Sequence, residues 1–459
     1  MDIAALKIKT LELAFQGKLT QQTVADGNVE VLLNELTAKS KKKVKRVNKE
    51  EVPFVIPDSW RWIYLGDVCS AVTGRLDANQ QDDSGKYPFF TCGAEVYKTL
   101  EYAFDCDAIL LGGNNASGDY KMHRYNGKFN AYQRVYVITD PPHEMLDYLY
   151  WVVRYWLPHL KYNSQGATTR FIKIGQVNGM LIPLPPMMEQ IRIVDTIKLV
   201  FEQLDIISEL QSIYLKDVNV LKRKLVDAAV QGKLKEQLLE DGTAEELYVA
   251  IQEEKDKLIK EGKIKKTKLT PAIANDEIPF EIPLNWKWVR LEELAANINI
   301  PMADGPFGSN LKKEHYTENR EVRIIQLSNV GDLGWRNENV KYTTFEYLKT
   351  IERSAVNAGD IVIAKMMPAG RAIIVPDIEK QYVLSSDCVK FVPHPLLSAK
   401  YINYAINSEI FRKQVLGTVT GVGRERTSLS KLKNFLIPIP PYAEQVRIVQ
   451  KLDTLLGMI

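Results

Sequence analysis

The feature that most constrains this chain is the return of short segments at long intervals along the sequence. VPFVIPDSWRWIYL from Val52 returns as IPFEIPLNWKWVRL from Ile278, with 7 of 14 positions identical. LIPLPPMMEQIRIV from Leu181 returns as LIPIPPYAEQVRIV from Leu436, with 10 of 14 positions identical. The first 20 residues also match residues 216–235 at 9 positions. The sequence therefore predicts two copies of one structural framework, which consists of these repeated segments.

The stretches enclosed by these matching borders do not resemble each other. Drift after an old duplication is the plain explanation, but drift alone does not preserve borders while erasing contents, so we favour contents diversified for recognition. The 459 residues, 45% hydrophobic and 25% charged, are typical of a soluble protein with two or three domains. We expect an α+β fold with an N-terminal helix and basic connector (1–51), a first α/β domain (52–186), a central helix and second connector (187–277), a second α/β domain (278–441) and a C-terminal helix (442–459).

The segment from Pro186 to about Leu234 predicts one long helix. Prolines precede it, Gly232 follows its last apolar residues, and alternate steps of four and three residues mark an apolar seam. A helix of about 45 residues is about 70 Å long, which exceeds the need of one globular domain. The seam consists of Ile193, Ile197, Val200, Leu204, Ile207, Gln211, Tyr214, Val218, Leu221 and Leu225.

Such a seam requires a partner helix, and the two chain ends can supply it. They continue its register with Ile448, Leu452, Leu455, Ile459, Ile3 and Leu6. Only the equivalents of residues 205–215 are missing between tail and head. We therefore expect the end helices to pack antiparallel on the central helix, as a coiled-coil spacer between the α/β domains. The chain would then be pseudo-circular, with a pseudo-twofold axis relating the domains.

A lysine-rich connector follows each copy of Gln-Gly-Lys-Leu. The first includes Lys39 to Lys49, and the second ends at Lys268. Charge runs of this kind are usually solvated linkers or helix faces. Phosphate contact at the base of each α/β domain is the alternative. The net charge of +3 is too small to indicate a nucleic-acid partner, so only clustered positive charge could do so.

The first α/β domain contains a polar segment rich in glycine and asparagine, from Gly112 to Arg134. Amides and guanidinium groups can pair with base edges, lysines suit phosphates, and glycines let the backbone approach a ligand closely. An ordinary polar hairpin explains the same composition equally well. A second polar loop follows at residues 163–173. The candidate DNA contacts here are Asn114, Asn115, Lys121, Arg124, Lys128, Gln133, Arg134, Thr168 and Arg170.

The second α/β domain carries similar residue types in another order. Its glycine-rich loop at residues 305–316 lacks the spacing of a Walker loop. Two apolar runs, 322–325 and 361–364, read as buried strands followed by polar residues. A further polar glycine loop begins at Thr418. The candidate DNA contacts are Ser309, Asn310, Lys312, Lys313, Gln326, Asn329, Arg336, Lys365, Arg371, Arg424 and Arg426.

Neither catalytic residues nor a metal site can be assigned from spacing. Asp140-Pro141-Pro142-His143 is close to the motif that holds a flipped base, but it ends in His and no glycine-rich cofactor loop precedes it, so we interpret it as a turn. Ile439-Pro440-Pro441-Tyr442 lacks the acceptor and reads as a helix start. Asp360 to Lys365 is an incomplete nuclease motif and reads as a strand. Close spacing is absent among Cys69, Cys92, Cys106 and Cys388.

These features together resemble the specificity subunit (HsdS) of type I restriction–modification systems. The resemblance rests on two Trp-x-Trp segments, two Ile-Pro-[Leu/Ile]-Pro-Pro-x-x-Glu-Gln-x-Arg-Ile-Val segments, a central coiled-coil helix and two unlike domains. It covers nearly the whole chain, and its most specific part is Pro183–Val194 with its copy Pro438–Val449. The chain departs from the pattern at Ile459, where the last helix ends before it equals the central one.

The resemblance implies a non-catalytic, DNA-binding subunit without a cofactor of its own. Each α/β domain would be a target recognition domain for one half of a bipartite, asymmetric site in double-stranded DNA. The helices would set the spacing and dock two methyltransferase (HsdM) subunits with S-adenosylmethionine, and restriction (HsdR) subunits would use ATP and Mg. The alternative is a self-sufficient sequence-specific DNA methyltransferase, against which the missing cofactor loop stands. No apolar run approaches the roughly 20 residues of a membrane span, so we expect a cytoplasmic protein without a membrane partner.

Overall fold

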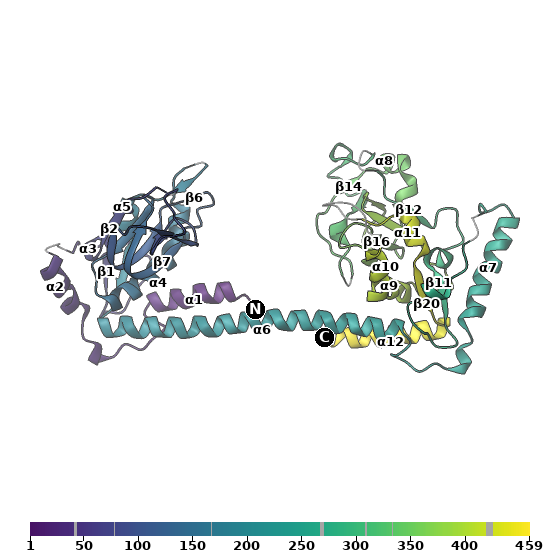
Figure 1. The fold of residues 1–459 in the computed structure, drawn as a ribbon, viewed down its shortest axis with the longest axis horizontal. Coiled ribbons are helices and arrows are strands. Elements are labelled where there is room, and N and C mark those ends of the chain that lie inside the picture. Colours follow the sequence, from purple (N-terminus) through teal and green to yellow (C-terminus); the bar gives the residue numbers. More distant parts are fainter. Residues whose placement is uncertain are drawn as a thin grey trace. The chain divides into compact units, whose positions relative to one another are not determined.

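The computed structural model describes residues 1–40, 44–77, 79–166, 168–266, 270–307, 310–332, 334–418 and 426–459. They form two compact units, Met1–Ile213 and Tyr214–Ile459, which we call unit 1 and unit 2. One helix, α6 (Met187–Val230), contains the boundary between them (Figure 1). Among the described helices, none has the length and apolar character that crossing a membrane requires.

Helix α6 is continuous over 44 residues, which confirms the predicted central helix. Its sequence contains neither Pro nor Gly, so each backbone hydrogen bond of the helix interior can form. Pro185 and Pro186 precede its first turn, where a missing N–H removes no helical bond. Gly232 follows with a φ of 71°, the left-handed conformation that ends many helices.

The apolar seam along α6 follows the prediction only in its first part. Ile193 and Ile197 are fully buried, but Leu221 is 44% exposed. The buried side chains near the end of the helix are Val226, Ala229 and Val230. The predicted seam is therefore wrong at this end, because each seven-residue step falls about 20° short of two turns of a straight α-helix. Over the four heptads from Ile193 to Leu221 the deficit is close to the rotation of one residue.

In unit 1, the N-terminal helix α1 (Ile3–Phe15) runs antiparallel to the first part of α6. Lys7, near the start of α1, pairs with Asp205 at 2.5 Å. Phe15, at the other end of α1, belongs to the same core cluster as Ile193. The contacts thus proceed along the two helices in opposite directions, as the sequence predicted.

In unit 2, the C-terminal helix α12 (Tyr442–Gly457) lies alongside the last part of α6 (Figure 1). Leu452 of α12 and Val226 of α6 are buried in one core cluster. Each unit therefore contains one end helix of the chain packed on its own part of α6. This agrees with the half-helices expected from the sequence register.

A two-stranded ribbon connects the framework of unit 1 to its α/β domain. It pairs β1 (Arg61–Tyr64) with β10 (Leu181–Leu184) in antiparallel register. Trp60, at the start of the ribbon, donates its indole Nε1 to the buried Oε2 of Glu189 at 2.8 Å. Gln22 donates to the other oxygen of this carboxylate, also at 2.8 Å. Glu189 lies in the first turn of α6, so this one side chain joins the ribbon, the helix and the loop after α1.

We call this set of hydrogen bonds around a buried glutamate a joint. Unit 2 contains a matching joint, made by the second copy of the repeated sequence segments. The ribbon pairs β11 (Lys287–Arg290) with β20 (Leu436–Ile439). Trp286 donates to the buried Oε2 of Glu444 at 3.0 Å, and Gln237 donates to its Oε1 at 3.1 Å. The repeated Trp and Glu-Gln positions therefore encode the same hydrogen bonds twice.

An ion pair beside each joint is repeated as well. Arg192 binds Asp26 through two hydrogen bonds of 2.6 and 2.7 Å, and Arg447 binds Asp241 through bonds of 2.6 and 2.5 Å. Hydrogen bonds from the arginines hold the pKa values of both aspartates below their usual range. Both pairs are therefore charged at neutral pH and fix the loops after the Gln-Gly-Lys-Leu segments.

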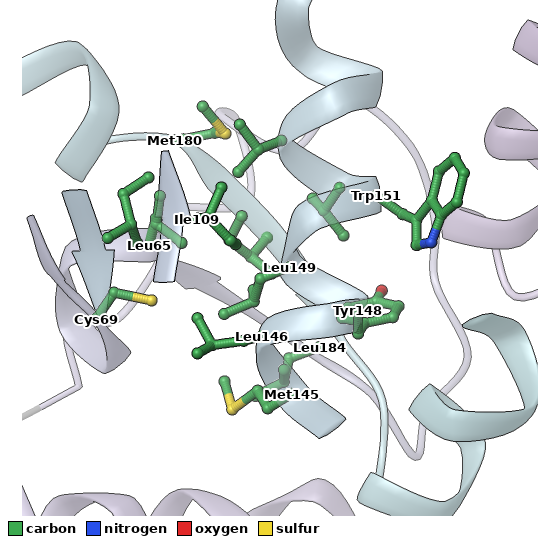
Figure 2. Close-up of a cluster of buried hydrophobic side chains, with 14 of the residues drawn as sticks. Leu65, Cys69, Ile109, Met145, Leu146, Tyr148, Leu149, Trp151, Met180 and Leu184 are labelled. Carbon is green, nitrogen blue, oxygen red and sulfur yellow. The ribbon is translucent and has the colours of Figure 1, made fainter. Parts of the chain in front are cut away.

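The α/β domain of unit 1 is built on one six-stranded sheet. Its spatial order is β2-β8-β5-β7-β3-β4. Helix α4 (His143–Tyr162) packs on the sheet, and Figure 2 shows Met145, Leu146 and Leu149 of this helix with Ile109 of β5. The strands are β2 (Ser70–Thr73), β3 (Tyr87–Phe90), β4 (Val96–Thr99), β5 (Phe104–Gly112), β7 (Met122–Ala131) and β8 (Val135–Thr139). The shorter elements of unit 1 are η1 (Val24–Asp26), α2 (Val29–Ser40), α3 (Leu65–Val68), β6 (Asn114–Asn115), β9 (Arg170–Phe171) and α5 (Ile174–Asn178).

The α/β domain of unit 2 contains two four-stranded sheets, with orders β12-β19-β16-β17 and β14-β13-β18-β15. The strands are β12 (Met302–Asp304), β13 (Val322–Ile325), β14 (Tyr342–Thr343), β15 (Ala355–Val356), β16 (Ile361–Ala364), β17 (Ala372–Ile374), β18 (Tyr382–Leu384) and β19 (Cys388–Phe391). Its helices are α8 (Phe345–Thr350), α9 (Ala399–Asn407), α10 (Glu409–Leu416) and α11 (Leu429–Asn434), and α7 (Ala244–Lys260) precedes the domain. Short 3-10 helices of the domain are η4 (Leu291–Leu294), η6 (Lys313–His315), η7 (Leu327–Asn329) and η8 (Glu352–Ser354), and η2 (Leu239–Asp241) and η3 (Asn275–Glu277) precede it. The two domains therefore differ in topology although their frameworks match.

Candidate nucleic-acid interface

Three polar loops of unit 1 meet beside the sheet. Strand β6 pairs with β9, so that Asn115 lies opposite Arg170. Gly113 donates its backbone N–H to the carbonyl of Arg134 at 2.7 Å. A Cβ at position 113 would lie 2.5 Å from that carbonyl oxygen, so only glycine allows this approach. The structure thus brings together the two polar segments that the sequence marked for this domain. It also places Lys161 of α4 there, against Gly118.

The side chains on these loops differ in whether their polar groups already have partners within the protein. Arg134 is exposed, and within the described part of the chain its guanidinium has no hydrogen-bond or ion-pair partner. Arg170 is also exposed and uses one nitrogen on the carbonyl of Lys161 at 3.2 Å. Thr168 is exposed in the same loop. Gln133 is exposed but donates to Asp77 at 2.7 Å. Among these side chains, Arg134 is therefore the cation whose donors are all unpaired within the described residues.

The other predicted contacts of unit 1 either have internal partners or are half-buried. The amide oxygen of Asn115 accepts hydrogen bonds from the backbone and hydroxyl of Ser117, which fixes the turn after β6. Lys121 pairs with Asp119 at 2.5 Å. Asn114 is half-buried in β6. Lys128, toward the other end of β7, lies over the ring of Tyr102 at 4.6 Å.

Arg124 belongs to an ion-pair network inside unit 1. Its guanidinium binds both carboxylate oxygens of Asp107, and its Nε donates to Asp147 at 3.0 Å. His143, at the start of α4, contacts the same Asp107 at 2.6 Å. The structure thus gives Arg124 a structural role in place of the predicted DNA contact, because its donors point to the half-buried carboxylates of Asp107 and Asp147. Asp140-Pro141-Pro142-His143 is the turn that opens α4, as interpreted from the sequence.

In unit 2, several predicted residues gather around the hairpin of β16 and β17. A β-bridge between Met366 and Arg426 places the exposed Arg426 beside the hairpin. Lys365 pairs with Asp304 of β12 at 2.5 Å. Arg371 is nearly buried, and burial lowers its pKa, an effect that Asp332 opposes and the charges of Arg336 and Arg412 increase. Arg336 itself is exposed. Ser309 and Arg424 lie outside the described residues.

Two amide side chains of unit 2 are engaged inside the domain instead. Asn329 is fully buried and donates its amide to the carbonyls of Arg336 and Glu338 at 2.9 and 2.7 Å. Gln326 donates its amide to the carbonyl of Asn339 at 2.9 Å. These amides hold the turn after β13, so we do not retain either residue as a base contact. The sequence could not separate this role from recognition, because both need the same donors and acceptors.

The remaining candidates of unit 2 lie on another loop. Lys312 and Lys313 are exposed beside η6, and His315 of this element stacks on Tyr347 with the ring centroids 4.1 Å apart. Asn310 is exposed, and its carbonyl accepts a hydrogen bond from Tyr347 at 2.5 Å. Among the described residues, no cluster of three or more His, Cys, Asp or Glu side chains could hold a metal ion.

Two α/β domains of unlike topology on two copies of one framework, which share the long helix α6, define a class of proteins with two variable domains on a duplicated helical support. The sequence model of the type I restriction modification DNA specificity domain matches residues 57–213 and 283–459. The chain belongs to this family, the specificity subunits (HsdS) of type I restriction–modification systems.

The similar proteins agree with this family. The chain is 27% identical over 417 residues to the type I restriction enzyme EcoDI specificity subunit of Escherichia coli, covering 87% of this chain and 82% of the relative. It is 24% identical to the EcoEI specificity subunit of the same organism, covering 98% and 88%. A solved structure described as the basis of complex assembly and conformational transition of the type I R-M system has the same fold, with a TM-score of 0.58, 17% identity and coverage of 88% and 92%. The relatives support a DNA-sequence specificity subunit and not the methyltransferase alternative.

Proposed function

We propose that each α/β domain of this specificity subunit reads one half of a bipartite, asymmetric site in double-stranded DNA. The observation that carries the proposal is the duplicated joint, in which Trp60 with Glu189 and Trp286 with Glu444 hold two domains of different topology. Matching frameworks that hold unlike domains suit a protein in which each domain reads a different DNA sequence. Two linked readers also bind more tightly than either alone, because the second binding event is intramolecular.

The loops of unit 1 offer the chemistry for one half-site. Arg134 can donate two hydrogen bonds to the O6 and N7 atoms of guanine in the major groove. Arg170 and Lys161 carry positive charge on the adjoining loop and helix, where they suit backbone phosphates. In unit 2, Arg426 and Arg336 are exposed, and among the described residues they lie near Met366 and Arg371 of the hairpin of β16 and β17. The two domains thus present different sets of donors.

Arg134→Ala is expected to weaken binding to the selected site by about 1–3 kcal/mol, because a bidentate contact to a base would be lost. The measurement is selection of bound duplexes from a randomised library by the full chain with its partner subunits, followed by sequencing and titration. The wild-type chain should select two short specified halves separated by unspecified bases. The variant should lose preference at one position of one half.

Arg134→Lys is the matched control for this test. Lysine keeps the charge but cannot make the paired contact of a guanidinium, so it should restore general affinity and leave the position relaxed. If Arg134→Ala instead weakened all sequences equally, the side chain would contact a phosphate. A single contiguous motif from the wild-type chain would contradict the bipartite proposal.

We also propose that catalysis belongs to partner subunits and that this chain needs no cofactor of its own. Two methyltransferase subunits docked on the helices would supply S-adenosylmethionine chemistry, and restriction subunits would supply ATP- and Mg-dependent cleavage. The support is the family, together with a sequence in which no glycine-rich cofactor loop precedes a base-holding motif. The one similar tetrapeptide, at residues 140–143, opens α4, and its His143 faces Asp107.

The rigorously purified chain is therefore expected to transfer no methyl groups, and addition of the methyltransferase subunits should create the activity. The measurement is incorporation of labelled methyl groups from S-adenosylmethionine into a duplex that carries the site. Asp140→Gly should leave the activity of the complex unchanged, because glycine accepts the φ of 87° at this turn. Methyl transfer by the chain alone would refute this assignment.

A further inference from the structure

A basic cavity of about 370 Å³ lies in unit 2, where α7 and the second connector meet the α/β domain. Five cationic side chains line it, and they come from four separate parts of the chain. These are Lys255 of α7, Lys265 and Lys266 of the second connector, Arg353 of η8 and Lys433 of α11. Segments nearly 180 positions apart in sequence thus direct positive charge to one hollow.

The charge in this cavity is only partly balanced. Glu292 is the acidic residue of the described lining, and its carboxylate pairs with Lys433 at 3.3 Å. Lys265, Lys266 and Arg353 are exposed and free of ion pairs within the described part of the chain. A concave surface with excess positive charge focuses the field and attracts an anion. Ammonium groups on flexible stems suit phosphate, which they bind as point charges.

The cavity adjoins the candidate reading surface of unit 2 through one short strand. Met302, at the start of β12, lines the cavity, and Asp304, at its end, holds Lys365. Two residues of a strand span about 7 Å. A DNA duplex carries one negative charge for about every 1.7 Å of its axis. A duplex placed on the hairpin of β16 and β17 would therefore bring backbone phosphates within reach of the cavity.

We propose that this cavity binds backbone phosphates of the DNA that flanks the half-site read by unit 2. The inference rests on the proposed function, and it assigns a sequence-independent role to the second lysine-rich connector. Both copies of the framework carry such a connector at the same point of the chain, although the domains that follow are unrelated. The DNA backbone is the ligand that two readers of different sequences share.

The test compares two double variants of the full chain, each of which removes two positive charges. K265Q/K266Q changes the cavity, and K257Q/K260Q changes lysines of α7 outside its lining. Affinity is measured by titration against a duplex with the selected site and one without it, over a range of NaCl concentrations. Thermal unfolding of both variants checks that they fold, and R353Q tests the cavity from an independent segment.

We expect K265Q/K266Q to bind both duplexes about five- to thirtyfold more weakly at 0.15 M salt, because each lost phosphate contact lowers the slope of log K against log salt by about 0.9. The selected motif should not change. The control variant should bind within about twofold of wild type. Methylphosphonate groups placed one at a time beside the half-site should weaken wild type at one or two positions and leave K265Q/K266Q unaffected there.

Two results would overturn the proposal. The first is a folded K265Q/K266Q variant with the affinity and salt slope of wild type. The second is a variant that binds DNA normally but associates more weakly with the methyltransferase subunits, since the cavity would then hold an acidic protein segment. Failure of the proposed function looks different, because the wild-type chain would select no bipartite motif whatever the cavity variants did.

Discussion

Exchange of residues 65–180 for the equivalent segment of another specificity subunit is expected to change one half of the recognised motif and to leave the other half intact. The structure shows why these ends suit an exchange. Tyr64 of β1 lies opposite Leu181 of β10, and Leu65 donates its N–H to the carbonyl of Met180 at 2.9 Å. The segment therefore leaves and returns to the framework at a single point, so a new domain can replace the old one without altering the joint at Glu189.

The measurement is the motif selected by the hybrid chain from a randomised library. The donor segment should contain a tyrosine at the position of Tyr148, because this residue packs on Phe15 and donates its hydroxyl to the carbonyl of Pro183. A hybrid with phenylalanine at this position is the matched control for folding and should keep the new motif with lower stability. A folded hybrid that changed both halves, or that kept the original motif, would show that the domains do not read DNA separately.

Much of the framework could be predicted from the sequence, because its contacts are made by residues that occur twice at matching borders. Trp60, Trp286, Glu189 and Glu444 stand in the repeated segments, and each pair makes the same hydrogen bond. A tyrosine that occurs in both α/β domains was not predicted from the sequence. Tyr148 and Tyr401 both donate to a carbonyl of the closing ribbon. The residues that follow them share an apolar pattern but no identity, and such a pattern is typical of any buried helix face, so the shared tyrosine gives little sequence signal.

The candidate interface was harder to predict than the framework, for a reason that concerns burial. Arg134 and Arg124 are ten residues apart in one polar segment, yet the first is exposed and the second is half-buried against two carboxylates. Asn329 likewise satisfies backbone carbonyls that the turn after β13 leaves open. Recognition and internal support use the same donor groups, so only the position of the side chain separates them. The basic cavity was beyond prediction because Arg353 and Lys433 reach it from segments that look unremarkable in sequence.

Insertion of seven residues into α6, between Gln211 and Ser212, is expected to lengthen the selected spacer between the half-sites by about three base pairs. Seven helical residues add about 10.5 Å, and base pairs are about 3.4 Å apart. The insertion rotates the helix by about 20° less than two full turns, so the residues after it nearly keep their face of α6. Side chains at this point are exposed, with Leu210 at 59% and Tyr214 at 62%, so the added turns disrupt no core.

The spacing in selected sites shows whether α6 acts as a rigid spacer of fixed length or as a flexible linker. An inserted segment of good helix formers should shift the spacing as a single new value, whereas seven glycine and serine residues should broaden it, because such a linker is flexible. Three added base pairs also rotate the DNA by about 100°, given 10 to 10.5 base pairs per turn, so the affinity for the longer site should be lower than that of the wild-type pair. If the helical insertion folds and still selects the original spacing, the length of α6 does not set the distance between the half-sites, and the docked partner subunits must set it instead.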